Sequence, residues 1–413
     1  MNILIINQPL GNRGDESAHR GFINSLIKKY PNAKIKVLFY GAKRSIDAFK
    51  VHNENVKYVN SQTVIPDRIY RRIFKYYTIG FIPLNLLRII SSFNVLVKYY
   101  NGADVVVCAP GGICLGGFKV WSHAGMLKIA KDLNKTLGYF ARSIGPYDDN
   151  TKENAQFKRA SIDLLTYCKS ISLRDEKSLA IADELGLKAI KTIDSAFLAS
   201  ADSEVPSTFV NMINGSKYFV FVPNALVWHY KYKHISHKEI LSFWIKLTDK
   251  LLLKHPTLKI AMLPQTMGYN TKCPDGYVFF TSIKEQCCCP DRVVVLDEQY
   301  GSDVQQKIIS KAEFLIGARY HSIVFSINQL IPFISLTYEH KMSGLLAMLG
   351  LDNRQINIED HFVGENHNSD DSTDNLVDEI IQRSTALIID NDKIITARDI
   401  AEDGFEQFFT SLI

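Results

Sequence analysis

The sequence lacks a hydrophobic run long enough to cross a membrane. A spanning helix needs about 18 or more consecutive apolar residues. The best candidate, Ile79–Ile90, is interrupted by a glycine, a proline, an asparagine and an arginine. The first residues, Met1–Pro9, lack the basic start of a secretory signal and soon reach polar residues and a proline. We therefore expect a cytoplasmic protein.

A strong charge imbalance is also missing. The chain has 48 Lys and Arg against 43 Asp and Glu, a formal net charge of +5. This mildly basic balance suits a protein that handles anionic small molecules or lies near an anionic membrane surface. It is too weak to indicate nucleic-acid binding.

The seven cysteines provide neither a disulfide framework nor a recognisable metal site. Cys287, Cys288 and Cys289 are adjacent, and the total is odd, unlike a secreted disulfide scaffold. Together with Cys273 they do not form the C-x-x-C pairs of structural zinc sites, and three successive side chains do not easily point at one ion. We therefore assign no metal ligands.

Composition and hydrophobic pattern instead predict an α/β protein. Of the 413 residues, 46% are hydrophobic and 22% charged, so each of two to three domains can bury a core. Apolar, β-branched runs alternate with amphipathic segments, which is typical of βαβ units and parallel sheets. We predict strands at residues 2–7, 34–39, 104–109, 136–141, 170–173, 189–193, 218–222, 258–263, 292–296, 313–316 and 332–336.

A small, polar stretch at residues 199–206 marks the expected domain boundary. We predict a first Rossmann-like domain at residues 1–200 and a second at 201–385. Residues 386–413 are expected to form a helical segment that packs back on the first domain. The acidic stretch 360–374 is expected to be a loop. Ligands would bind between the two open α/β domains.

The clearest candidate site is Gly317-Ala318-Arg319-Tyr320-His321, between an apolar strand and an apolar helix. Ligands of open α/β sheets bind at the carboxyl ends of strands, where helix N-termini attract phosphate. Arg319 offers a bidentate clamp for phosphate or carboxylate, and His321 can move a proton near neutral pH. A structural arginine followed by a helix-capping histidine is the alternative.

Two further cations follow strand ends. Lys341 follows the next strand and can reach the same anion or be a solvated surface lysine. Arg174 precedes the predicted helix whose start Asp175 can cap. A cation is disfavoured at a helix N-terminus unless an anion is near, so Arg174 is less easily explained as structural.

Glycine-rich turns form a second group. Gly11-Asn12-Arg13-Gly14-Asp15 leads into a helix predicted from about Glu16 to Tyr30, and its glycines imply a close approach of the backbone or positive φ. It lacks the G-x-G-x-x-G fingerprint of dinucleotide binding. Asp15 caps the helix or accepts a hydrogen bond from a sugar hydroxyl. Gly111 and Gly112 suggest another cradle, and His123 beyond it is either a site residue or a polar helix residue.

Residues 67–100 interleave six basic residues with aliphatic and aromatic ones. The pattern suits an interfacial helix on anionic lipid. An amphipathic excursion that packs on the sheet is the alternative.

Several short motifs follow one another from the start of the chain to about Leu351. They are residues 11–16 (GNRGDE), 111–112 (GG), 143–146 (SIGP), 173–175 (LRD) with Ser178, 194–197 (DSAF), 317–321 (GARYH) and 331–341 (IPFISLTYEHK). In order and spacing they resemble the polysaccharide pyruvyl transferase family. The basic excursion and the cysteine-rich stretch are not among that family's motifs.

The resemblance implies two Rossmann-like domains that face each other across a cleft, similar to GT-B glycosyltransferases. It implies transfer of the pyruvyl unit of phosphoenolpyruvate to two hydroxyls of one sugar, as a cyclic ketal, with release of phosphate and no cofactor. Arg319 and Arg174 would hold the donor and His321 would transfer the proton. We also assign Asp15 to catalysis, and to substrate binding Lys341, Asn12, Gly111, Gly112, His123 and Ser143.

The expected partners are phosphoenolpyruvate, a sugar or lipid-linked oligosaccharide acceptor and the inner membrane surface, without nucleic acid. A GT-B glycosyltransferase with a nucleotide-sugar donor would use the same strand-end loops, with Arg319 and Lys341 on the diphosphate. A binding protein on the same scaffold is a non-enzymatic alternative. Release of phosphate, release of nucleoside diphosphate, or no turnover separates the three hypotheses.

Overall fold

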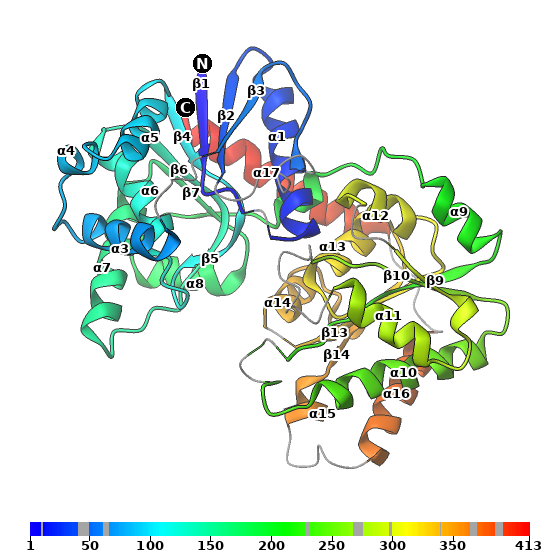
Figure 1. Cartoon of the computed structure of the whole chain (residues 1–413). Coiled ribbons are helices and arrows are strands. Elements are labelled where there is room, and N and C mark those ends of the chain that lie inside the picture. The colour runs from blue at the N-terminus through cyan, green and yellow to red at the C-terminus, as the bar shows by residue number, and fades with distance from the viewer. Residues whose placement is uncertain are drawn as a thin grey trace. The chain divides into compact units, whose positions relative to one another are not determined.

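The computed structural model describes residues 1–9, 11–39, 49–60, 66–227, 229, 232–266, 276–296, 300–338, 340–363, 370–384 and 391–413. The chain divides into two compact units (Figure 1). The first comprises Met1–Leu10, Asp15–Ala199 and Ala397–Ile413, and the second comprises Gly11–Gly14 and Ser200–Thr396.

The first unit is built on a parallel sheet. Its strands run in the order β3 (Val56–Asn60), β2 (Lys34–Phe39), β1 (Asn2–Ile6), β4 (Val105–Cys108), β6 (Thr136–Ile144), β7 (Ser170–Leu173) and β8 (Ile190–Lys191), and β5 (Gly111–Leu115) also pairs with β6. All six strands predicted for this half are confirmed. The sequence reasoning missed β3 and β5.

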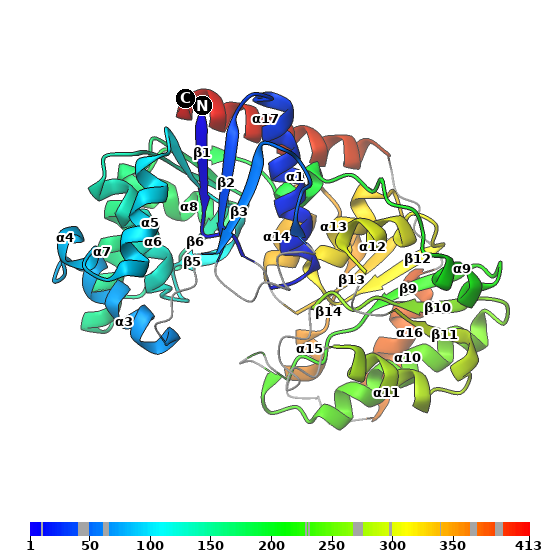
Figure 2. The same ribbon diagram turned by 45° about the horizontal axis from the view of Figure 1, so that its top comes forward.

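An aromatic cluster fills one side of this sheet. Phe22 of α1 (Arg13–Lys29) stacks on Phe140 of β6 with ring centroids 4.8 Å apart, and Phe408 of α17 (Asn391–Leu412) lies 4.9 Å from Phe140. A Cβ atom added at Gly138 would lie 2.6 Å from Phe408, so α17 needs a glycine beneath it. Figure 2 shows α17, in red, beside α1. The last helix of the chain thus completes the core of the first unit.

Helices α3 (Asp67–Thr78), α4 (Leu84–Leu87) and α5 (Ser91–Asn101) make up the basic excursion. Helix α3 packs on α6 (Trp121–Asp132), where a Cβ at Gly125 would overlap the Phe74 ring. The ring centroid of Phe93, in α5, lies 5.3 Å from that of Phe74 and 5.5 Å from that of Tyr70. The excursion is therefore amphipathic, as predicted, and one of its faces is core. Across the described residues, no helix is long and apolar enough to span a bilayer.

The second unit has its own parallel sheet, in the order β11 (Val293–Val295), β10 (Lys259–Met262), β9 (Tyr218–Val222), β12 (Phe314–Gly317), β13 (Phe333–Thr337) and β14 (Gln355–Asn357). The five predicted strands are confirmed and β14 was missed. Its helices are α9 (Ser207–Ile213), α10 (His237–Lys254), α11 (Tyr277–Gln286), α12 (Ser302–Ile309), α13 (Tyr320–Asn328), α14 (His340–Met348), α15 (Glu359–Val363) and α16 (Asp370–Ser384).

The loop expected at residues 360–374 is wrong at both of its ends. Residues 360–363 belong to α15 and 370–374 to α16, and residues 364–369 lie outside the described part of the chain. Lys250 of α10 lies 2.9 Å from the Asp378 carboxylate and 3.8 Å from that of Asp374. Lysines of the neighbouring helix therefore offset the negative charge that favoured a loop.

Candidate functional site

Each sheet has one point at which its strand order reverses. The chain leaves β1 toward β2 and β3, and then returns to β4 on the other side. In the second sheet the same reversal occurs between β9 and β12. Ligands of open α/β sheets bind beside the carboxyl ends of such strands. A ligand site is therefore expected at these two points.

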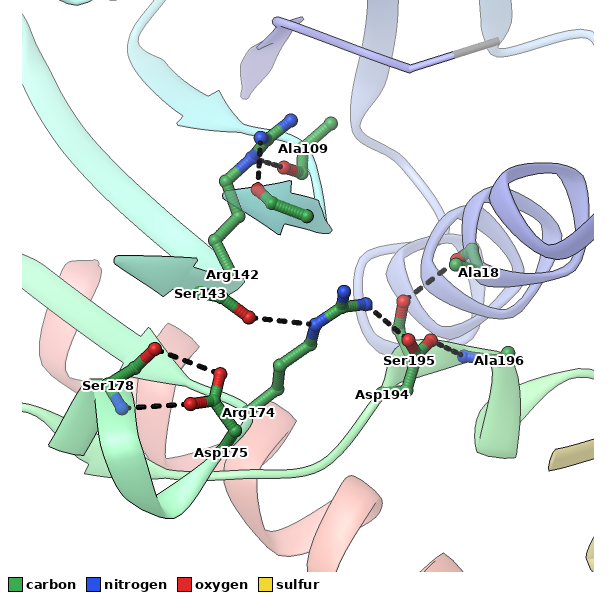
Figure 3. A network of polar contacts seen from close by, with 11 residues as sticks. Ala18, Ala109, Arg142, Ser143, Arg174, Asp175, Ser178, Asp194, Ser195 and Ala196 are labelled. Atoms are coloured by element: carbon green, nitrogen blue, oxygen red, sulfur yellow. Dashed lines mark hydrogen bonds and ion pairs between the residues drawn. The ribbon is translucent and has the colours of Figure 1, made fainter. Parts of the chain in front are cut away.

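Arg142 occupies the reversal point of the first sheet, and the sequence analysis did not single it out. This side chain is only 1% exposed. Its Nε donates to Ala109 O at 2.6 Å, Nη1 to Gly112 O at 3.1 Å and Nη2 to Asn7 O at 2.7 Å. Three carbonyls, from the residues after β1 and β4 and from β5, therefore solvate one buried cation. Figure 3 shows the bond to Ala109. The signal available in the sequence was an arginine within an otherwise largely apolar strand, where the neighbouring residues are buried.

Gly111 and Gly112 lie beside this guanidinium, in strand β5 instead of the predicted cradle loop. A Cβ at Gly111 would lie 3.1 Å from Arg142 Nη2, and a Cβ at Gly112 would lie 4.0 Å from Arg174 Nη2. Gly111 also has a positive φ of 158°, so packing and backbone conformation both favour glycine there. At Gly112 the added atom would make only an ordinary van der Waals contact.

Arg174 follows β7 and pairs with the fully buried carboxylate of Asp194. Its Nε also donates to Ser143 Oγ at 3.3 Å (Figure 3). The predicted anion near Arg174 is thus supplied by the protein. Asp194 also accepts a hydrogen bond from the Ala196 backbone N–H, which fixes its position. The arginine is 12% exposed and is held in one orientation.

Asp175 caps α8 (Glu176–Glu184), as the sequence predicted. Its two carboxylate oxygens accept from Ser178 N at 2.8 Å and from Ser178 Oγ at 2.9 Å. Ser178 Oγ in turn accepts from Ile144 N at 2.9 Å, so this cap fastens the end of β6 to α8. Ser143 and Arg174 are thereby held in register.

A cavity of about 430 Å³ opens at the same edge of the first sheet. Its lining combines Arg142 and His123 with the aromatic side chains of Phe39, Tyr70, Phe118 and Trp121. A smaller cavity of about 220 Å³ lies at the amino-terminal edge, beside Asn2 and Lys34. The larger cavity is the better candidate, because parallel sheets bind ligands at the carboxyl ends of their strands.

His123 is a buried member of this cavity wall. Its ring Nε2 lies 3.7 Å from Cys108 Sγ, and its backbone oxygen accepts from Asn7 Nδ2 at 3.1 Å. Burial, and then the positive charge of Arg142, holds the pKa of His123 well below its ordinary value. The ring is neutral at pH 7 and therefore suits hydrogen bonding more than proton donation.

In the second unit, Arg319 follows β12 and immediately precedes α13, at the β9–β12 reversal point. Its carbonyl accepts from Ser322 N at 3.1 Å and from Ser322 Oγ at 2.6 Å, but its side chain does not cap the helix. Arg319 and His321 are both half-buried. Arg319 therefore stands at the N-terminus of α13, the kind of position at which proteins bind phosphate.

The Gly11–Gly14 segment belongs to this second unit. Asn12 forms a β-bridge with Thr266, and Arg13 N donates to Gln265 O at 2.8 Å. A Cβ at Gly14 would overlap the imidazole of His321. The close approach predicted from the glycines of this turn is confirmed at Gly14, and its partner is His321.

Asp15 differs from one of its expected settings, whereas Lys341 is exposed, as one of its two alternatives had it. Helix α1 begins at Arg13, so Asp15 lies within its first turn and is not its cap. There the negative carboxylate interacts favourably with the positive end of the helix dipole. Lys341 is exposed in the first turn of α14. Among the cysteines, Cys287 is buried and Cys288 exposed, whereas Cys273 lies outside the described residues.

The structure therefore brings Gly111, Gly112, Ser143 and Arg174 together in the first unit, around Arg142. His123 lies in the adjoining cavity. In the second unit it brings the Asn12 turn to His321, beside Arg319.

Solved structures of similar fold include a UDP-GlcNAc 2-epimerase from Neisseria meningitidis bound to UDP-GlcNAc, with a TM-score of 0.59, 14% identity and coverage of 98% of this chain and 100% of that one. A putative UDP-N-acetylglucosamine 2-epimerase from Listeria monocytogenes has a TM-score of 0.61 at 8% identity, with 100% and 95% covered. These likenesses show a GT-B-type fold, with two Rossmann-like α/β units.

Sequence comparison is more specific. The amylovoran biosynthesis protein AmsJ of Erwinia amylovora is 22% identical over 372 residues, which span 85% of this chain and 86% of that protein. The family model described as polysaccharide pyruvyl transferase matches residues 12–340. The match includes the β9–β12 reversal point and, of the residues assigned to the site from the sequence, all except Lys341. Strand β1 precedes it. The chain therefore belongs to the polysaccharide pyruvyl transferase family.

Proposed function

We propose that this protein transfers the pyruvyl group of phosphoenolpyruvate to two hydroxyls of one sugar in surface or capsular polysaccharide biosynthesis, forming a cyclic ketal and releasing phosphate. The observation that carries the proposal is the position of Arg319. Arg319 is the residue just before α13, at the β9–β12 reversal point. It lies within the residues that match the family model. A phosphate fits such a position because free backbone N–H groups and a guanidinium both attract it.

In the proposed reaction, a proton is added to the methylene carbon of phosphoenolpyruvate, and the cation-like centre beside it is attacked by the first sugar hydroxyl. The C–O bond to phosphate then breaks, and the second hydroxyl closes the ring. Of the two protons lost by the hydroxyls, one balances the new methyl group and the other leaves with phosphate. No electron acceptor or donor is consumed.

His321 is proposed to carry the proton, because an imidazole gives and takes protons near neutral pH. The ring can lie where it does only because residue 14 is a glycine, since a Cβ there would overlap it. Arg319 and Lys341 are proposed to bind the phosphate, and Asn12 to bind substrate beside His321. We keep Arg174 as a candidate donor ligand. Asp15 is proposed to accept a hydrogen bond from a reacting hydroxyl.

The cavity of the first unit is proposed as the acceptor site. Sugar rings present C–H faces to aromatic walls and hydroxyls to polar groups, and this cavity offers Trp121 and Tyr70 beside Arg142 and His123. Trp121 is held by its Nε1–H, which donates to Glu153 at 3.3 Å. Gly111, Gly112 and Ser143 shape the adjoining edge.

The test is turnover of phosphoenolpyruvate with a panel of sugar acceptors, followed by phosphate release and by the mass of the product. His321→Ala should lower kcat about 10²–10⁴-fold, the range for loss of a general acid or base, while phosphoenolpyruvate affinity persists. Arg319→Ala should weaken that affinity about 30–150-fold, from the loss of about 2–3 kcal/mol of charged hydrogen bonding.

Lys311 is exposed just before β12, the strand that leads to Arg319. Lys311→Ala is therefore the matched control and should change neither kcat nor phosphoenolpyruvate affinity. Release of nucleoside diphosphate from a sugar nucleotide, without turnover of phosphoenolpyruvate, would instead establish a glycosyltransferase. The binding-protein hypothesis would be favoured if phosphoenolpyruvate bound but did not turn over with any acceptor, and if His321→Ala bound it as wild type does.

A further inference from the structure

The segment from α3 to α4 in the first unit exposes large apolar side chains and arginines. We call it the α3–α4 face. Its apolar members are Ile69 and Leu86 (each 52% exposed), Tyr76 (37%), Phe81 (73%) and Ile89 (76%). Its cations are Arg68, Arg72 and Arg88, all exposed. Apolar groups of this size, exposed with cations among them, indicate an interaction surface.

The side chains of the α3–α4 face are held outward by the packing behind them. Ile69, Arg72 and Tyr76 are spaced at i, i+3 and i+7, so they share one side of α3. The Arg72 guanidinium lies 5.9 Å from the Tyr76 ring, and that ring lies 6.2 Å from the Phe81 ring. Behind them, Phe74 is fully buried. The face is therefore a defined element of the folded protein.

Charge identifies the kind of partner. Residues 68–103 contain no aspartate or glutamate. Among the described residues, no carboxylate lies within ion-pair distance of Arg68, Arg72 or Arg88. Exposed apolar groups ringed by unbalanced arginines complement an anionic bilayer, into which the apolar groups insert while the cations meet lipid phosphates. A second copy of the chain fits less well, because a two-fold interface would oppose like charges.

We propose that the α3–α4 face docks on the surface of an anionic lipid bilayer. The inference deepens the proposed function and rests on it for its purpose, because the same helix reaches the proposed acceptor cavity. Asp67, Tyr70 and Arg71 of α3 line that cavity, whereas Ile69 and Arg72 point outward. Docking through α3 brings the cavity to the headgroup layer, where a lipid-linked saccharide presents its sugars.

The experiment is sedimentation of the full chain with vesicles of phosphatidylserine and phosphatidylcholine, compared with phosphatidylcholine alone. Wild type should bind the anionic vesicles and not the neutral ones, less tightly as salt rises. Each cation near such a surface contributes roughly a fivefold factor, so Arg68→Gln with Arg72→Gln should weaken binding about 30-fold. Phe81→Ser with Ile89→Ser should weaken it roughly tenfold or more.

Matched controls lie on other surfaces. Lys152→Gln with Arg159→Gln removes two exposed cations at α7 (Lys152–Tyr167), and Leu253→Ser with Val278→Ser removes apolar side chains that are 70% and 77% exposed in the second unit. Both controls should bind vesicles as wild type does. Equal losses in controls and α3–α4 variants would overturn the proposal, as would wild-type binding that ignores lipid charge.

Two other measurements separate the remaining outcomes. Light scattering without vesicles tests self-association, and a dimer abolished by Phe81→Ser with Ile89→Ser would replace the bilayer with a second copy of the chain. Phosphoenolpyruvate binding should be equal in wild type and all four double variants. Vesicle binding without phosphoenolpyruvate binding would leave the docking surface standing and remove the proposed function.

Discussion

Replacement of the buried Arg142 by methionine is the sharpest test of how the first unit is held together. Methionine matches much of the side chain's length and apolar stem but offers no hydrogen-bond donor. The carbonyls of Asn7, Ala109 and Gly112 would lose the donors that now reach them at 2.7, 2.6 and 3.1 Å. They come from the segments after β1, β4 and from β5, so the loss would be felt across the sheet edge.

The size of the effect follows from two opposing terms. Each charge-assisted hydrogen bond contributes about 1.5–3 kcal/mol, or roughly 4–9 kcal/mol for three. Removing the buried cation recovers several kcal/mol of its desolvation cost, as estimated for ions in protein interiors. We therefore expect Arg142→Met to destabilise the first unit by about 3–5 kcal/mol, the range for breaking one partner of a buried charged cluster. Arg142→Lys keeps the charge and should lose less.

Hydrogen exchange read by mass spectrometry measures this locally. Peptides covering β1, β4 and β6 should exchange at least about 100-fold faster in Arg142→Met, since 1.4 kcal/mol corresponds to a tenfold change in opening. Peptides of the second-unit strands should not change. The exposed Arg159→Met is the matched control and should leave all of these rates unaltered. Wild-type exchange in Arg142→Met would refute the claim that the guanidinium fastens these strand ends.

Three further predictions concern other described contacts. Asp194→Asn removes the charge paired with Arg174 and should cost about 2–3 kcal/mol in urea denaturation; unchanged stability would mean that the pair contributes nothing. Burial lowers the pKa of His19 to about 3, so the unfolded chain, with its ordinary pKa near 6.5, binds the extra proton and stability falls as pH drops from about 6.5 toward 3. His19→Gln should flatten that fall by up to about 1.4 kcal/mol per pH unit in denaturation between pH 6.5 and 5, and an identical slope would contradict the assigned protonation. Gly14→Ala displaces the ring of His321 and should reduce kcat about 10²–10⁴-fold with phosphoenolpyruvate affinity retained; wild-type kcat would show that the ring position does not matter.

The parallel sheets were largely predictable because central strands are buried on both faces. Runs such as Val105–Cys108 and Tyr218–Val222 are continuously apolar, begin after a charged residue and are soon followed by a proline, so the pattern alone locates them. The missed strands lack this signal. Strand β3 (VKYVN) mixes valine with lysine, tyrosine and asparagine, and only its first residue is buried. Strand β14 has three residues, with one buried isoleucine between two polar residues.

Strand β5 was missed for another reason. Its two glycines favour a loop in isolation, but Gly111 pairs with Arg142 and Leu115 with Ile144 along β6. The neighbouring strand imposes extended backbone where local propensity does not. Tertiary pairing therefore decides the conformation of this segment.

The candidate site was predictable only in part. Arg319 and Arg174 were found because each follows a strand and precedes a helix, a position that sequence reveals. Arg142 lies inside an apolar strand, and the carbonyls that it contacts come from segments 30 to 135 residues away in the chain. A buried cation that is solvated by backbone carbonyls leaves no motif, because carbonyl groups are common to all residues.

Helix α17 has a consequence for the order in which the chain can fold. Phe405, Phe408 and Phe409 are buried against Phe22 and Phe140, although the segment that carries them, Ala397–Ile413, follows the whole second unit in sequence. During synthesis, multidomain chains generally fold from the amino terminus. Here the first unit emerges first but keeps an open aromatic surface on its sheet until the second unit has been made. The second unit, apart from its Gly11–Gly14 segment, is continuous and can close earlier, so a nascent chain of this protein must protect that surface from aggregation for most of its synthesis.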